Sequence, residues 1–178
     1  DAVGAAHSRG VIHRGLKPAN VLLTSRDLEV AEARVADFGL ARLLGDDWLQ
    51  SRVNTSLRQS LSIDEAQTIA RPRAARSSTG ALLGTYEYMS PEQREGLDVD
   101  ERSDIFAIGV MLYRMITGRR LIGRAKAAST VIDSLADGWD DLIDRCLEED
   151  PAERHCDMAE LARALRTLEM KEKSLHEE

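Results

Sequence analysis

The chain has 178 residues, of which 43% are hydrophobic and 31% charged, the composition of one globular domain with its own core. Its formal net charge of −7 argues against nucleic acid as a partner, because nucleic-acid-binding domains usually carry a clustered basic face. The most apolar stretch, residues 105–116, contains Arg114 and is shorter than the roughly 20 residues that cross a bilayer. We therefore expect no membrane segment within the chain, and a cytoplasmic location, either free or as part of a larger membrane-anchored protein.

The first half of the chain predicts little regular structure. Residues 1–10 resemble the end of a helix, with Gly10 suited to the left-handed position that follows one. A helix rarely starts this abruptly without a cap, so we expect further sequence upstream. Two β-like runs at 21–23 and 33–36 are predicted to pair as a small hairpin. Residues 41–83 hold no sustained apolar period, which favours a long loop.

The second half is predicted to be helical. Residues 103–118 are apolar on nearly every face, which is typical of a buried helix, with Ser103 or Asp104 as its N-cap and Gly118 at its end. Apolar residues spaced by three and four predict amphipathic helices around it, over residues 129–137, 139–150 and 157–170. Residues 171–178 form a charged tail. The predicted fold is therefore mainly α, a helical bundle around a buried central helix with a small β-hairpin.

Five short motifs occur in a fixed order. They are HRGLKPAN at 13–20, DFG at 37–39, GTYEYMSPE at 84–92, SDIFAIGV at 103–110 and DPAER at 150–154. One tripeptide recurs by chance, but five motifs in order are a specific signal. They resemble the C-terminal lobe (C-lobe) of the α+β protein kinase fold, in the form found in eukaryotic-like serine/threonine kinases of bacteria. The resemblance implies a partial kinase domain over residues 1–170, with 41–83 in the activation segment and the N-terminal lobe (N-lobe) absent.

The resemblance also implies ATP and Mg²⁺ as cofactors of the intact domain, and Ser or Thr of a protein as the substrate. Asn20 and Asp37 occupy the family's cofactor-binding and Mg²⁺-ligand positions, and both offer the hard oxygen atoms that Mg²⁺ prefers. Lys17 would place a positive charge beside the transferred phosphate and would bond the hydroxyl of Thr85. Read singly, Asn20 or Asp37 could be an ordinary turn residue; the order of the motifs favours the functional role.

Other positions correspond to structural residues of the family, namely His13, Arg14, Phe38, Gly39, Glu92, Asp104 and Arg154. Among them, Glu92 and Arg154 would form a buried ion pair. Asp104 would bond the backbone of the catalytic loop near His13 and Arg14. His13 would pack in the core and would not itself catalyse, in keeping with its apolar flank.

The stretch before Thr85 corresponds to the part of the activation segment where regulation occurs. Thr79 lies six residues before Thr85, where bacterial relatives often carry a phosphosite, and Ser77 and Ser78 lie beside it. A phosphate there would add about −1.5 to −2 charges and could pair with Arg14. The same stretch is equally compatible with a flexible polar segment without a regulatory role.

Two positions depart from the family pattern. Gly15 stands where the family has the Asp that serves as catalytic base, a group worth about 10² to 10⁴ in rate. Arg114 stands where relatives frequently have a Glu that in some of them selects basic substrates. With the N-lobe also absent, we expect impaired phosphoryl transfer and doubtful ATP binding by this chain alone. The alternatives are a pseudokinase that acts as a scaffold or allosteric module for a docking protein, or a remnant in which one codon change replaced Asp.

Overall fold

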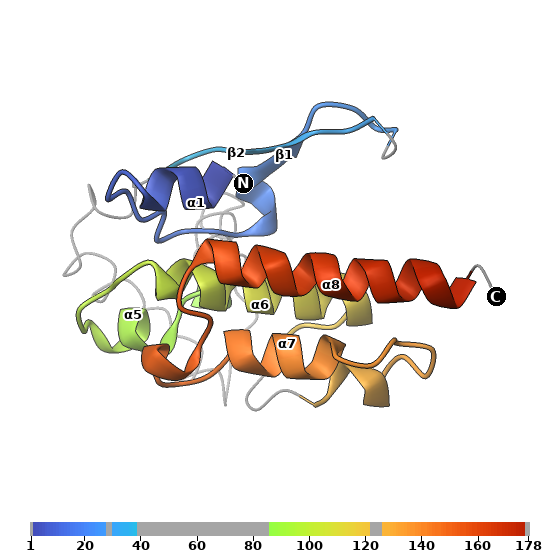
Figure 1. The fold of residues 1–178 in the computed structure, drawn as a ribbon. Coiled ribbons are helices and arrows are strands. Elements are labelled where there is room, and N and C mark those ends of the chain that lie inside the picture. The colour runs from blue at the N-terminus through green and yellow to red at the C-terminus, as the bar shows by residue number, and fades with distance from the viewer. Residues whose placement is uncertain (1, 28–29, 39–85, 122–125, 177–178) are drawn as a thin grey trace, which may run out of the picture.

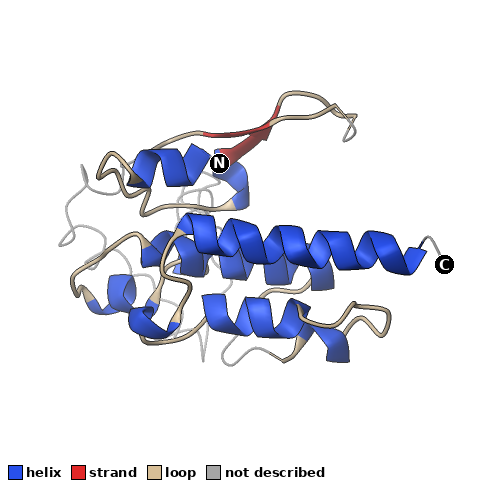
Figure 2. Ribbon diagram, in the orientation of Figure 1, coloured by secondary structure: helices blue, strands red, loops and turns tan. Residues whose placement is uncertain are grey.

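The protein is mainly helical, with a single two-stranded sheet in the described part of the chain (Figures 1 and 2). The computed structural model describes residues 2–27, 30–38, 86–121 and 126–176. The helices and strands are α1 (Ala2–His7), β1 (Val21–Leu23), β2 (Ala33–Val35), α5 (Pro91–Glu95), α6 (Arg102–Thr117), α7 (Trp139–Cys146) and α8 (Met158–His176). Short 3₁₀ turns cover Pro18–Asn20, Ala128–Thr130 and Pro151–Glu153. The predicted mainly helical fold with a small hairpin is confirmed.

Helix α6 is the axis of the core. Its buried residues lie on nearly every face, as its apolar sequence predicts, and it packs against α7 and the turn at 128–130. It ends at Gly118, whose φ of 66° is the left-handed conformation expected there. The predicted N-cap is wrong, because the helix already begins at Arg102. Ser103 and Asp104 lie inside its first turn, where their buried side chains bond other segments instead.

The helices predicted around α6 are only partly correct. Residues 129–137 form a 3₁₀ turn followed by further turns, and consecutive β-branched residues at Val131 and Ile132 disfavour a helix there. Helix α7 ends at Cys146, four residues earlier than expected, and Asp150 before Pro151 is extended, as a residue preceding proline prefers. Helix α8 instead continues past residue 170 to His176, so most of the charged tail is helical.

The hairpin and α1 lie together above the other helices in Figure 1. Strands β1 and β2 are antiparallel, with Leu22 opposite Arg34, and the chain leaves α1 through Gly10 at a φ of 71°. Hydrogen bonds from Ala36 to Asn20 and from His13 to Ala36 hold the segments 13–20 and 36–38 side by side. Within the described residues, none of the helices combines the length and apolar character needed to span a bilayer.

Candidate active site

The loop 13–20, here called the catalytic loop, is fixed to the central helix by one carboxylate. Asp104 is 1% exposed and accepts the backbone N–H of His13 at Oδ2 and that of Arg14 at Oδ1, both at 2.8 Å. The ring Nε2 of His7 lies 2.8 Å from Oδ2 as well. Because Asp104 is in the first turn of α6, the positive end of the helix dipole favours its negative charge.

His13 joins the catalytic loop to the segment that carries Asp37. The ring is fully buried, and its Nδ1 accepts the backbone N–H of Gly15 at 3.3 Å. The proton is therefore on Nε2, which donates to the carbonyl of Ala36 at 2.9 Å. The ring also contacts Phe38, with the two centroids 4.7 Å apart. These contacts place His13 within the core and away from solvent.

Gly15 lies at the centre of the loop in a conformation that does not require glycine. Its φ is outside the left-handed region, unlike that of Gly10 or Gly118. A Cβ added at Gly15 would meet only Nδ1 of His13, at 3.9 Å, which is an ordinary van der Waals contact. The position therefore has room for a Cβ, and its backbone conformation is one that residues other than glycine adopt.

Two residues of the site adopt backbone conformations that are rare outside glycine. Arg14 has φ of 63° and Asp37 has φ of 62°, and such residues are typically held in place by their surroundings. Arg14 is held from both sides, since its N–H bonds Asp104 and its carbonyl accepts Nε2 of Gln93 at 2.8 Å.

Gln93 is a structural residue of the site that the sequence reasoning missed. Its Oε1 accepts the backbone N–H of Ser90 at 3.1 Å, which forms the capping box at the start of α5. The pattern Ser-x-x-Gln at 90–93 is the known signal for such a box and would have predicted this short helix. No comparable sequence signal identifies His7, whose contact with Asp104 depends on packing between distant segments.

Asn20 lies beside the segment that carries Asp37, because its backbone bonds Ala36, the residue before Asp37. The side-chain N–H of Asn20 donates to the carbonyl of Gly15 at 2.9 Å, and its backbone carbonyl accepts the N–H of Ala36 at 2.8 Å. Asn20 is buried, whereas Asp37 is exposed. One amide oxygen and one carboxylate suit Mg²⁺, which is usually held by few protein ligands together with phosphate oxygens and water. Among the described residues there is no larger cluster of metal-ligating side chains.

Several predicted site residues lie outside the described residues. They are Gly39, Ser77, Ser78, Thr79 and Thr85, together with the whole segment 41–83. Lys17, by contrast, is described and half-buried, directly before the turn at Pro18–Asn20. Beneath the loop, a cavity of about 10 Å³ is lined by Gly15, Leu16 and Tyr88 among others, which is near the lower limit for one water.

Glu92 and Arg154 form a bidentate ion pair that ties α5 to the segment before α8. Both N···O distances are 2.8 Å, and the two side chains are almost fully enclosed. Burial alone would raise the pKa of Glu92, but hydrogen bonds from Arg154 and from the hydroxyl of Ser103 outweigh burial and lower this pKa to about 2. The guanidinium also lies 5.1 Å from the ring centroid of Phe106.

Comparison with known proteins gives a consistent result. The family described as the protein kinase domain matches residues 1–58 and 68–165. Serine/threonine-protein kinase pkn2 of Myxococcus xanthus is 35% identical over 181 residues, which cover 93% of this chain and 19% of that protein. PknL of Mycobacterium tuberculosis is 30% identical over 169 residues, covering 87% of this chain and 35% of that protein. The chain therefore spans about a third or less of these two relatives.

Solved structures agree with the sequence relatives. The kinase domain of Mycobacterium tuberculosis PknI superposes with a TM-score of 0.60 at 25% sequence identity. The match covers 94% of this chain and 50% of the PknI chain. The helices around α6, the short hairpin and the catalytic loop together thus have the arrangement of about half of that domain.

Proposed function

Because this chain belongs to the protein kinase family, on its bacterial serine/threonine branch, we propose that it is a kinase domain whose phosphoryl transfer is impaired at Gly15. The proposal rests on one contrast: the catalytic loop is held by several hydrogen bonds, but it lacks a proton-accepting side chain at position 15. Asp104, His13 and Gln93 hold the loop in place, yet position 15 offers no group that accepts or orients a hydroxyl proton.

The remaining residues of the site would keep their family roles. Asn20 and Asp37 would hold Mg²⁺ against the phosphates of ATP, and the bound metal would neutralise charge on the phosphate oxygens. Lys17 would place its ammonium group near the transferred phosphate and help to bind the substrate hydroxyl. Binding of nucleotide and substrate is therefore expected to suffer less than their reaction.

The size of the defect follows from the missing base. A general base contributes about 10² to 10⁴ in rate, which corresponds to roughly 3 to 5 kcal/mol of activation free energy. Part of that contribution is positioning of the hydroxyl, because phosphoryl transfer has a loose transition state. We therefore expect slow turnover with nearly normal substrate binding.

The second candidate function is a pseudokinase that binds a partner protein. The specific observation in its favour is that the structural framework is complete around the altered position: Arg14 keeps its unusual φ, and the ion pair between Glu92 and Arg154 is intact. A framework of this kind preserves a binding surface whether or not phosphate is transferred. In this alternative the partner is a docking protein and nucleotide regulates the association.

Substitution Gly15→Asp tests the proposal. It should raise ATP turnover on a general protein substrate by about 10² or more, and should leave the melting temperature nearly unchanged because a Cβ fits at this position. Turnover is measured with any sequence that precedes Asp1 in the natural protein included. Gly15→Asn is the matched control, since it adds a side chain of the same shape without a basic carboxylate.

The outcomes separate the two candidates. A parent protein that already turns over as fast as Gly15→Asp would contradict the lost-base argument. Binding of Mg²⁺·ATP, followed by thermal shift, without turnover in either form would favour the pseudokinase. The double variant Gly15→Asp with Asp37→Asn should lose the regained turnover, because it removes the carboxylate proposed to hold the metal.

A further inference from the structure

Three guanidinium groups, those of Arg94, Arg114 and Arg120, surround the segment Tyr86–Tyr88. This segment directly follows Thr85 in the sequence. Arg120 contacts Oε2 of Glu87 through Nε at 3.0 Å and Nη2 at 2.9 Å. Arg114 lies farther off, with Nη1 3.6 Å from Oε1 of the same carboxylate. Arg94 stacks over the ring of Tyr86 and donates to the carbonyl of Glu87 at 3.4 Å.

The exposed fractions of the Glu87, Arg114 and Arg120 side chains show which charge these residues present to a ligand. The side chain of Glu87 is 6% exposed, whereas Arg114 is 44% and Arg120 58% exposed. Glu87 can neutralise only one of these two guanidinium groups, so the pair keeps an excess positive charge at the surface. A cationic ligand would have to displace both arginines to reach Glu87, while an anionic ligand would meet their N–H groups directly.

Arg114 is also poorly satisfied by its neighbours. Among the described residues, Oε1 of Glu87 makes no hydrogen bond, and its 3.6 Å separation from Arg114 is longer than a direct contact. The hydrogen bond that Arg114 does make is to the hydroxyl of Tyr88, at 2.8 Å through Nη1. Among the residues that the structure describes, that bond leaves other N–H groups of the guanidinium for a ligand.

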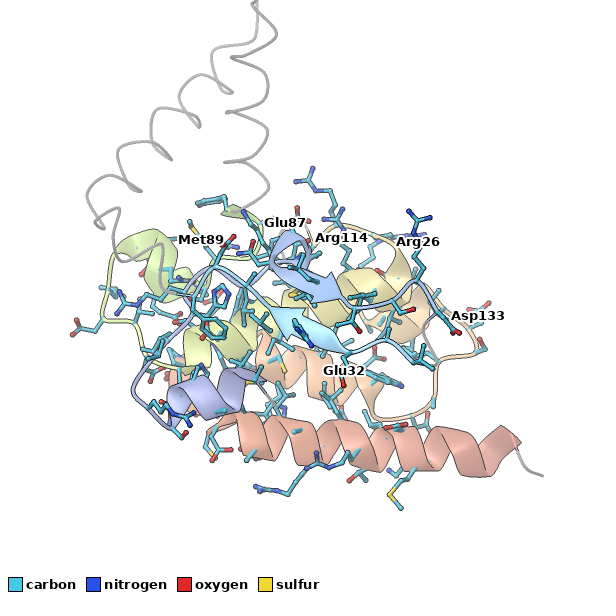
Figure 3. All side chains as sticks on the ribbon, turned by 90° about the horizontal axis from the view of Figure 1, so that it is seen from above. Arg26, Glu32, Glu87, Met89, Arg114 and Asp133 are labelled. Atoms are coloured by element: carbon cyan, nitrogen blue, oxygen red, sulfur yellow. The ribbon has the colours of Figure 1, made fainter. Side chains whose placement is uncertain are left out.

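Tyr88 connects this cluster to the catalytic loop. Its side chain lines the same small cavity as Gly15 and Leu16, so one tyrosine separates Arg114 from the loop. Figure 3 shows Glu87, Met89 and Arg114 on the same side of the molecule, with α8 along the opposite side. A peptide whose hydroxyl lies at Gly15 would therefore be separated from Arg114 by Tyr88, which contacts Arg114 and lines the cavity at Gly15.

We propose that Arg114 and Arg120 form a binding site for the acidic side chains of a polypeptide ligand. The inference rests on the proposed function, in that segment 84–92 is taken to receive the substrate. A guanidinium group matches a carboxylate through two parallel hydrogen bonds, which gives geometric selectivity as well as attraction. The ligand preferred at this surface is therefore a Ser- or Thr-containing segment flanked by Asp or Glu.

Peptide binding tests the site without requiring turnover. Short fluorescein-labelled peptides with one central Ser and flanking Asp, Ala or Lys are titrated with the protein, and fluorescence anisotropy gives each dissociation constant. The Asp peptide should bind tightest, and its advantage should shrink as salt is raised. Arg114→Glu and Arg120→Glu should each weaken the Asp peptide by about fivefold or more, and weaken the Ala peptide much less.

The matched control is Arg163→Glu, which makes the same charge change at an exposed position on α8. It should leave the preference intact, and Arg114→Gln provides an uncharged variant should Arg114→Glu fold poorly. Equal binding of the Asp and Ala peptides, or equal effects of Arg163→Glu and Arg114→Glu, would overturn the inference. An acidic preference in a protein that Gly15→Asp fails to activate would count against the proposed function and leave this site standing.

Discussion

All five N–H groups of Arg154 have acceptors inside the protein. Two go to Glu92, and the others go to the backbone carbonyls of Arg102, Glu148 and Glu149. A buried charge satisfied in this way stabilises the fold only while its partner remains, because the partner left behind would be an unpaired charge away from water.

Arg154→Met should therefore lower the free energy of unfolding by about 3 to 5 kcal/mol, since it leaves Glu92 buried and unpaired. Urea denaturation of both proteins measures the difference. Arg145→Met is the comparison, because Arg145 pairs with Glu160 at the same 2.8 Å but is 45% exposed. It should cost less than about 1 kcal/mol.

The double variant Glu92→Leu with Arg154→Met provides a further check. Removing both charges should recover part of the loss, because no unpaired ion remains in the core. If Arg154→Met costs no more than Arg145→Met, the buried pair does not contribute as argued.

At the level of single residues, the sequence predicted positions within motifs better than contacts between them. Glu92, Asp104 and Arg154 could be identified because the motif order assigns each a partner. His7 could not, because its contact with Asp104 joins positions 97 residues apart and no local pattern encodes it. The sequence likewise could not predict that the side chain of Glu87 is buried while that of Arg114 is exposed, because this difference depends on how α6 packs beside segment 86–90.

At the scale of elements, the contact between α6 and α7 depends on the lack of a side chain at Gly109. A Cβ there would lie 2.6 Å from the Cβ of Cys146 and 3.1 Å from a side-chain atom of Leu147. The two helices therefore approach more closely than any other residue at position 109 would allow.

Gly109→Ala should destabilise the protein by about 1 to 3 kcal/mol through overpacking. The expected sign is informative, since alanine in an open helical position would instead stabilise by about 1 kcal/mol. Thermal unfolding measures the change. Gly109→Ala with Cys146→Gly, which transfers the missing Cβ to α7, should recover part of the loss, and an unaltered or raised melting temperature for Gly109→Ala would contradict the close contact.

Helix α6 could be predicted from the sequence, because a helix that is apolar on all of its faces is stable only when it is buried in the core. The expected helix at 129–137 has apolar spacing but forms turns, and Ser129 instead donates its N–H to Asp140 of α7 at 3.1 Å. Periodicity predicts which residues face the core and does not by itself decide whether the backbone between them is helical.

At the scale of the whole molecule, acid should lower the free energy of unfolding over two pH ranges. Burial and, secondarily, the charge of Arg145 lower the pKa of His155, although Glu160 opposes this effect. The unfolded chain then binds the proton more readily than the native one, so stability falls as pH drops below about 6.5. Glu92 has its pKa lowered from 4.5 to about 2, so its stabilising contribution is present above pH 4.5 and is lost as pH falls towards 2.

Urea unfolding at neutral, mildly acidic and strongly acidic pH measures both ranges. His155→Gln should weaken the pH dependence of stability in the upper range and leave the lower range unchanged. Glu92→Gln should weaken it in the lower range, to which Glu160 also contributes, because a hydrogen bond from the backbone N–H of Cys156 helps to lower the pKa of Glu160 to about 2. A free energy of unfolding whose pH dependence His155→Gln does not alter would show that this histidine does not control the upper range.

The supports of the catalytic loop reach it through backbone atoms: the N–H groups at positions 13 to 15 and the carbonyls at 14 and 15. None of these bonds depends on the side chain at position 15. Natural selection that acts through protein abundance would therefore not distinguish Gly15 from Asp, and a lineage could lose or regain the base without passing through a poorly folded intermediate. Under the proposed function, a single codon change at position 15 would therefore alter the catalytic activity of this domain and leave its architecture unchanged.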